Sequence, residues 1–149
     1  MENLVFDNGI KRYRVNNEGE LAFNPSDPNV YGRFMDAIDK ISSVENEMVE
    51  KGKNIKKDDG EAVVRMMVDA DRKVKTILQE VFGRNNDFDA IFGSVNIMAV
   101  ASNGERVITN FINALMPIVA AGAEQCATQK ISTAVAEADS RRAQRMGTV

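Results

Sequence analysis

Short apolar and aromatic runs separated by turn residues make the first 23 residues typical of β-strands. Asn8-Gly9 lies between two such runs, and this pair favours the type I′ turn of a two-residue hairpin. A second turn signal, NNEGE at 16–20, leads to another apolar run. The pattern predicts a β-hairpin or a three-stranded meander over 3–23, which needs a covering helix because so small a sheet is marginally stable alone.

A helical pattern begins after the segment FNPSDPN. Pro25 and Pro28 each lack a backbone donor and disfavour helix in the preceding residue, so they end the strand, and Asp27 can cap a helix that starts at Pro28. Apolar residues then recur at helical spacing: Tyr31, Phe34, Ile38, Ile41 and Met48. This spacing predicts a helix over 28–51, with Gly52 as its C-terminal stop.

The next periodic run predicts a second long helix over 59–82. Asp58 and Glu61 have the spacing of a capping box, and Gly83 closes the run. The apolar positions alternate spacings of four and three: Val63, Met67, Ala70, Val74, Ile77 and Val81. Because only a short loop separates the first two helices, we expect an antiparallel pair whose apolar faces share one core.

Two further helices complete the pattern. Residues 85–96 suit a short helix with Asp87 at its start and Gly93 at its end. The segment SNGE at 102–105 resembles a capping box and opens the longest helical run, which we expect over 103–138.

These elements predict a fold that is mainly α (α+β). A small N-terminal β-hairpin or meander precedes a bundle of three long helices and one short helix. With 149 residues, 44% of them hydrophobic, the chain can bury roughly two thirds of its unfolded surface in one domain, 1–149. We expect strands within 1–23, a helical bundle over 28–140 and a flexible tail over 141–149. Cys126 is the one cysteine, so no intramolecular disulfide is expected, and its surroundings suit a buried or half-buried residue.

Charge argues against a nucleic-acid binder, since the net charge is -3 and the pI is about 5.1. The basic clusters at 51–57 and 141–145 suit a solvated loop and a helix C-terminus. The N-terminal segment lacks the pattern of a signal peptide. We therefore expect a protein of the bacterial cytoplasm.

The chain has no histidine, which removes the commonest general base and the usual transition-metal ligands. The acidic groups are Asp58/Asp59/Glu61, Asp69/Asp71 and Asp87/Asp89. The first and third groups lie where helix caps are expected, and the second pair does not share a helix face, so capping or solvation explains them better than Mg²⁺ binding. We expect a protein that is not an enzyme, with no catalytic residue, metal or cofactor.

Residues 107–123 carry no charge, which raises the question of a membrane span. The stretch is at the short limit for crossing a bilayer, and Thr109, Asn110 and Asn113 share one face opposite the large apolar residues. This amphipathic pattern favours a core helix, so no membrane contact is expected. The alanine-rich continuation after Pro117 allows close approach of another helix, and both an inter-subunit contact and docking onto the same domain stay open.

Three segments, FDNGIKRYRVN, FNPSDPNVYGRFMDAIDKI and DAIFGSVNIMAVASNGERVITNFINALMPIV, follow one another along most of the chain. In this succession the chain resembles the small tail assembly chaperones of long-tailed phages and prophages of Gram-positive bacteria. The most telling pieces are FNPSDPN running directly into a helix, and an FG element followed by a polar cap and an apolar helix. The alanine-rich, arginine-bearing end has no counterpart in this resemblance.

The resemblance implies a cytoplasmic protein made during tail assembly. Such chaperones bind the aggregation-prone tape measure protein, help to recruit tail tube subunits around it, and are generally absent from the finished particle. The implied partners are the tape measure protein and the tail tube protein, held through apolar grooves that accept partner helices. The alternative is a small structural virion protein of the tail or of the head-tail joint. An exposed sheet edge and the small-residue helix also predict a homo-oligomer.

Phe88, Ile91 and Phe92 are the candidate partner-binding residues, because three large apolar groups exceed what a short connecting helix needs. The alternative is that they fill the core beneath the long helices. The same two interpretations, a partner surface or core filling, apply to Met66 and Met67. Methionine can adapt an interface to several partners, but it ordinarily fills cores.

Overall fold

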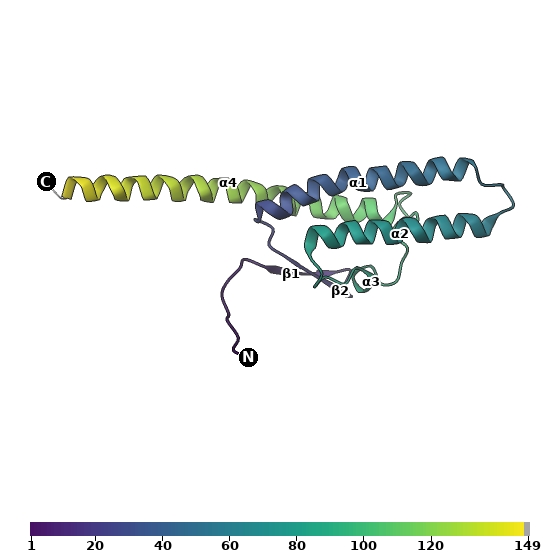
Figure 1. The fold of residues 1–149 in the computed structure, drawn as a ribbon, viewed down its shortest axis with the longest axis horizontal. Coiled ribbons are helices and arrows are strands. Elements are labelled where there is room, and N and C mark those ends of the chain that lie inside the picture. Colours follow the sequence, from purple (N-terminus) through teal and green to yellow (C-terminus); the bar gives the residue numbers. More distant parts are fainter. Residues whose placement is uncertain (148–149) are drawn as a thin grey trace.

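The protein is an α-rich bundle with a small hairpin at its N-terminal end. The computed structural model describes residues 1–147, with side chains described for 1–129 and 135–145. The elements are β1 (Lys11–Val15), β2 (Gly19–Phe23), α1 (Pro28–Lys53), α2 (Gly60–Phe82), α3 (Phe88–Ile91) and α4 (Val107–Gly147). Figure 1 shows α2 and the first part of α4 alongside α1, with the hairpin and α3 on one side of the bundle. The predicted fold class is confirmed.

The hairpin forms at the second of the two predicted turns. β1 and β2 pair antiparallel, with Tyr13 opposite Leu21. Asn16 and Asn17 supply the turn with φ values of 50° and 62°, a left-handed conformation that asparagine tolerates better than most residues. The NNEGE turn is therefore confirmed.

The predicted turn at Asn8-Gly9 and the third strand are wrong, because residues 1–10 form no strand. The side chain of Asn24 packs against Gly9, where an added Cβ would lie 2.6 Å from Asn24 Nδ2. The same Nδ2 donates a hydrogen bond of 3.1 Å to the carbonyl of Asn8. A contact from outside the local sequence thus holds the chain open at the point where the hairpin was expected.

Helix α1 begins as predicted and ends later. Asp27 is its N-cap and accepts a 2.9 Å hydrogen bond from the backbone N–H of Asn29, with Pro28 at the first helical position. The predicted stop at Gly52 is wrong, since α1 continues to Lys53 and Asn54 caps it. Among the expected apolar residues, Tyr31 is 40% exposed. Its neighbour Val30 occupies the buried position instead.

Helix α2 ends at the predicted residue and starts one residue later than predicted, with a different N-cap. Asp59, not Asp58, is the N-cap, and its side chain accepts a 3.0 Å hydrogen bond from the backbone N–H of Ala62. At the other end Gly83 adopts a φ of 99° and donates its N–H to the carbonyl of Gln79 at 2.8 Å. The predicted glycine stop at this end is confirmed.

Helix α4 starts later and ends later than predicted. Residues 101–105 form a tight turn, closed by a 2.7 Å hydrogen bond from the N–H of Ala101 to the carbonyl of Glu105. This turn uses the segment in which a capping box was predicted at Ser102, so that prediction is wrong and α4 begins at Val107. The helix continues through Pro117 to Gly147, although we expected it to end before the tail 141–149. Residues 148–149 lie outside the described part.

A chain of aromatic rings joins the hairpin to the helices. The ring centroids of Phe23 and Phe82 are 5.0 Å apart, and those of Phe82 and Phe88 are 6.1 Å apart. Phe92 then contacts Phe111 of α4 at 4.8 Å. Offset and edge-on ring pairs of this kind add to the stabilisation from burial, so the small sheet is held by the core rather than by its own hydrogen bonds.

Gly122 lies at a close contact between α4 and the segment that precedes α1. A Cβ at this position would lie 1.8 Å from the carbonyl oxygen of Pro25, closer than any real contact. Next to it, Ser26 Oγ donates a 3.3 Å hydrogen bond to Gln125 Oε1. Beyond this contact α4 leaves the bundle as a single helix (Figure 1).

We expect Gly122→Ala to lower the free energy of unfolding by about 1–3 kcal/mol, because the new methyl group forces α4 away from Pro25. Gly32→Ala in α1 is the matched control, since nothing lies within 4 Å of its added Cβ. That change should instead stabilise the helix by roughly 0.5–1 kcal/mol. Urea denaturation of both variants measures the two free energies of unfolding. Equal changes in the same direction would contradict the close approach of Gly122 to Pro25.

Candidate partner-binding site

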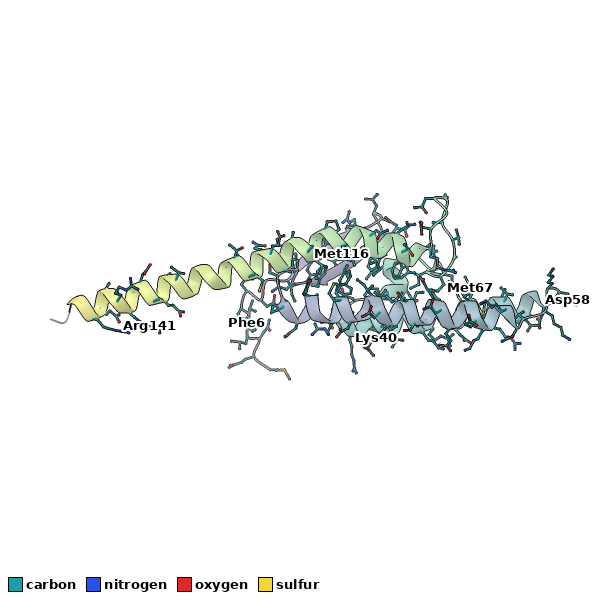
Figure 2. All side chains as sticks on the ribbon, turned by 90° about the horizontal axis from the view of Figure 1, so that it is seen from above. Phe6, Lys40, Asp58, Met67, Met116 and Arg141 are labelled. Atoms are coloured by element: carbon teal, nitrogen blue, oxygen red, sulfur yellow. The ribbon has the colours of Figure 1, made fainter. Side chains whose placement is uncertain are left out.

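The tip formed by α1 and α2 extends beyond the cover of α4. In Figure 1 the C-terminal end of α1 and the N-terminal end of α2 run past the start of α4. Figure 2 labels Asp58 at this end of the molecule and Arg141 at the opposite end. Two packed helices without a third leave part of their shared apolar face open to solvent. An open apolar face is therefore expected at the tip.

An apolar groove of about 360 Å³ lies between α1 and α2 in this tip. Its floor is formed by Val44, Met48, Ile55, Ala62, Met66 and Ala70. Two of these six residues, Ala62 and Ala70, have short side chains. We call these six residues and the space above them the tip groove.

Methionine gives the tip groove an adaptable surface. Met48 and Met66 both line it; Met48 is 5% exposed and Met66 is half-buried. An unbranched thioether changes shape easily and packs favourably against varied apolar partners. The sequence indicated this feature through the run RMMVD, although core filling was the simpler interpretation for Met66.

Charged side chains of both signs border the tip groove. Glu47 Oε1 lies 2.8 Å from Lys51 Nζ on α1 and 3.5 Å from Lys73 Nζ on α2. The hydrogen bond from Lys51, together with the positive charges of Lys51 and Lys73, holds the pKa of Glu47 below its usual value. The carboxylate is therefore ionised throughout the neutral range. Arg65 and Asp69 also line the groove and complete a mixed rim.

The predicted site residues lie in the core rather than in the tip groove. Phe88 and Ile91 are 4% and 2% exposed, and Phe92 is half-buried against Phe111. The core alternative therefore describes their positions in this fold. Their role in partner binding stays a prediction, and it requires the core to open.

Two of the three acidic groups supply helix caps, and the third binds a loop through a hydrogen bond. Asp59 and Asp87 are N-caps, as the sequence predicted for these groups. For Asp71 we expected capping or solvation; its Oδ1 accepts a 2.8 Å hydrogen bond from the backbone N–H of Ile97 in a separate loop. Among the residues that the structure describes, no cluster of three or more His, Cys, Asp or Glu side chains has the arrangement of a metal site.

Lys75 links α2 to α3 through two carboxylates. Its Nζ lies 3.0 Å from Asp71 Oδ2 and 2.9 Å from Asp89 Oδ1. Partial burial lowers the pKa of Lys75, but the hydrogen bonds and charges of Asp89 and Asp71 outweigh this effect and raise it above the usual value. The ammonium group is therefore protonated at neutral pH and has a structural role here.

One face of the apolar first part of α4 packs against the bundle, and the remainder of its surface is largely exposed. By length and composition Val107–Gln129 would suffice to cross a membrane, with a mean hydropathy of 1.4. Its side chains Ile108, Phe111, Leu115 and Val119 are buried against the bundle. This face matches the amphipathic pattern of the sequence. Cys126, farther along, is half-buried as expected.

Comparison of the chain with protein-family models, with curated proteins and with solved structures gives no match in any of the three.

Proposed function

We propose that this protein is a tail assembly chaperone of a long-tailed phage or prophage and that its tip groove binds apolar helical segments of the tape measure protein. The resemblance in sequence supplies the class of protein and the partner. The tip groove supplies the physical basis, because an amphipathic helix binds by placing its apolar side chains in such a hollow.

The openness of the tip groove is the observation that carries this proposal. Val44, Met66 and Ala62 are only half-buried, so the free protein leaves apolar surface without a covering helix. A partner helix gains hydrophobic stabilisation by covering this surface, and a groove of this size limits that gain. Reversible binding suits a chaperone, which must release the tape measure protein as the tube is built.

The mixed rim suits the same role. Lys51, Lys73 and Arg65 attract acidic positions of a partner helix, while Glu47 and Asp69 attract basic ones. Rim charges mainly orient a partner and accelerate its association. The proposed activity is binding in the cytoplasm of the bacterial host, without a catalytic step, and recruitment of the tail tube protein follows from the resemblance alone.

Co-expression with the tape measure protein of the same phage tests the proposal. The full chain should co-purify with the tape measure protein and keep it soluble, and purified phage particles should lack the chain. Absence of any complex would overturn the proposal. Presence of the chain in finished particles at a fixed copy number would favour the alternative, a small structural protein of the tail or of the head-tail joint.

A further inference from the structure

The two edges of the β-hairpin differ in how they are covered. On the β2 side, the buried side chain of Asn86 accepts a 2.8 Å hydrogen bond from the backbone N–H of Ala22 and donates one of 3.0 Å to its carbonyl. The Asn86 amide thus takes the place of a neighbouring strand. On the β1 side, the sheet of the described residues contains no further strand.

The backbone groups on the open edge of β1 belong to Arg12 and Arg14. Because the N–H and carbonyl of Ala22 both point to Asn86, they point away from its partner Arg12 in the β1–β2 ladder. Opposed residues in an antiparallel ladder alternate between hydrogen-bonded and non-bonded pairs. Arg12 and, two positions on, Arg14 therefore present their donors and acceptors outward, where a third strand would bind.

The N-terminal arm, residues 1–10, has the features of such a strand. It forms no helix or strand of its own, and Leu4, Val5 and Phe6 are 86%, 80% and 72% exposed. In Figure 1 the arm leads away from the bundle. A continuous exposed apolar run of this kind marks an interaction segment.

The arm does not reach the β1 edge of its own chain. To do so it would have to reverse at Asn8-Gly9, where Asn24 holds the carbonyl of Asn8. The same segment carries side-chain hydrogen bonds from Gly9 N–H to Asp7 Oδ1 (2.9 Å) and from Ile10 N–H to Asn8 Oδ1 (3.1 Å), and it forms no hairpin turn. The free edge and the free arm of one molecule are therefore kept apart.

Charge and side-chain alternation both match the arm to β1. The strand carries Lys11, Arg12 and Arg14, of which Arg12 also lies 3.3 Å from Glu20 Oε1 of β2, whereas the charged side chains of residues 2–10 are the acidic Glu2 and Asp7. In β1, Tyr13 and Val15 are half-buried on the core side and the two arginines are exposed on the other side. An arm running antiparallel to β1 can thus place apolar side chains beside apolar ones and a carboxylate beside an arginine.

We infer that the N-terminal arm of one copy adds to the β1 edge of a second copy as a third, antiparallel strand. With Phe6 opposite Tyr13, Leu4 lies opposite Val15 and Asp7 lies opposite Arg12. Arm exchange in both directions closes a dimer, and exchange in one direction builds a ring or a filament. This surface is separate from the tip groove, so the inference does not rest on the proposed function.

Sedimentation of the full chain tests the inference first. The unmodified protein should self-associate at high micromolar concentration, whereas Phe6→Asp and Arg14→Pro should both be monomeric. Arg14→Pro removes an outward N–H at a sheet edge, a position that tolerates proline. Val135→Asp, which places the same charge at an exposed valine of α4, should leave self-association unchanged. A monomeric unmodified protein, or an oligomer that survives Phe6→Asp, would overturn the inference.

Cross-linking between two different chains tests the register, and it remains informative if Arg14→Pro fails to fold. In a Cys126→Ser background, a Leu4→Cys chain is mixed with a Val15→Cys chain and oxidised. These positions form a non-hydrogen-bonded pair in the proposed strand addition, with Cβ atoms close enough for a disulfide. A mixed disulfide dimer is expected. Only like-with-like dimers, or none, would reject this register and the arm exchange with it.

Discussion

Replacing Phe88 by alanine is expected to lower the free energy of unfolding by about 3–5 kcal/mol. Its ring is 4% exposed and lies between those of Phe82 and Phe92, with centroid distances of 6.1 Å and 6.2 Å. Removing it breaks the aromatic chain between α2 and α4 and leaves a cavity. Since small domains have total stabilities of roughly 5–15 kcal/mol, this loss is a large fraction of the whole.

Chemical denaturation measures this loss, and Val95→Ala supplies the control in the neighbouring loop. Val95 is 47% exposed, so its truncation should change stability by no more than about 0.5 kcal/mol. If Phe88→Ala were as stable as the control and lost only the ability to bind the tape measure protein, Phe88 would belong to a partner surface. That outcome would contradict the core position and favour the partner-surface interpretation of the two that the sequence left open.

A substitution in the tip groove should instead weaken partner binding and leave the stability of the fold nearly unchanged. Met66→Glu places a carboxylate on the apolar floor, near Asp69 and Glu47. We expect a tenfold to hundredfold loss of affinity for tape measure helices, because a partner's apolar residue would have to desolvate the charge. This loss corresponds to about 1.4–2.8 kcal/mol of binding free energy. Stability should change little, since Met66 is only half-buried.

Met35→Glu is the matched control for this prediction. Met35 lies on α1, is 41% exposed and does not line the tip groove. Titration calorimetry of both variants with one tape measure fragment compares them directly, and a thermal melt of each verifies folding. Met66→Gln, which keeps the side-chain length without the charge, serves if Met66→Glu is destabilised. Equal affinities of the Met66 and Met35 variants would place the binding surface elsewhere.

Features controlled by neighbouring residues were predictable from the sequence. Asp27 and Pro28 set the start of α1 by local hydrogen bonding and a fixed φ, and Gly83 ends α2 through its own backbone freedom. The same holds for the turn at Asn16 and Asn17. In each case the residues that decide the structure lie within one turn of one another.

Features controlled by distant residues were not predictable. The turn at Asn8-Gly9 has a strong local preference for a hairpin, yet the side chain of Asn24 competes for the same backbone. Asp71 looked solvated because its partner, the N–H of Ile97, lies in a separate loop.

The tip groove also depends on relations between elements that periodicity does not show. The sequence predicted an antiparallel α1–α2 pair, but not that α4 begins too late to cover its far end. The large size of three apolar residues suggested a partner-binding surface at Phe88, Ile91 and Phe92. Size alone does not distinguish a buried cluster from an exposed one. Met48 appeared only as one position of an apolar stripe.

The most direct test of the tip groove is a methyl NMR titration of the full chain, carrying isotope-labelled methionine, with helical fragments of the tape measure protein. Met48 and Met66 report on the tip groove, while Met116, 36% exposed on α4, reports on a surface outside it. The proposed binding predicts that the methyl signals of Met48 and Met66 shift in proportion to bound fragment and that the signal of Met116 stays in place. Binding of a fragment that shifts Met116 and leaves Met48 and Met66 unchanged would contradict it.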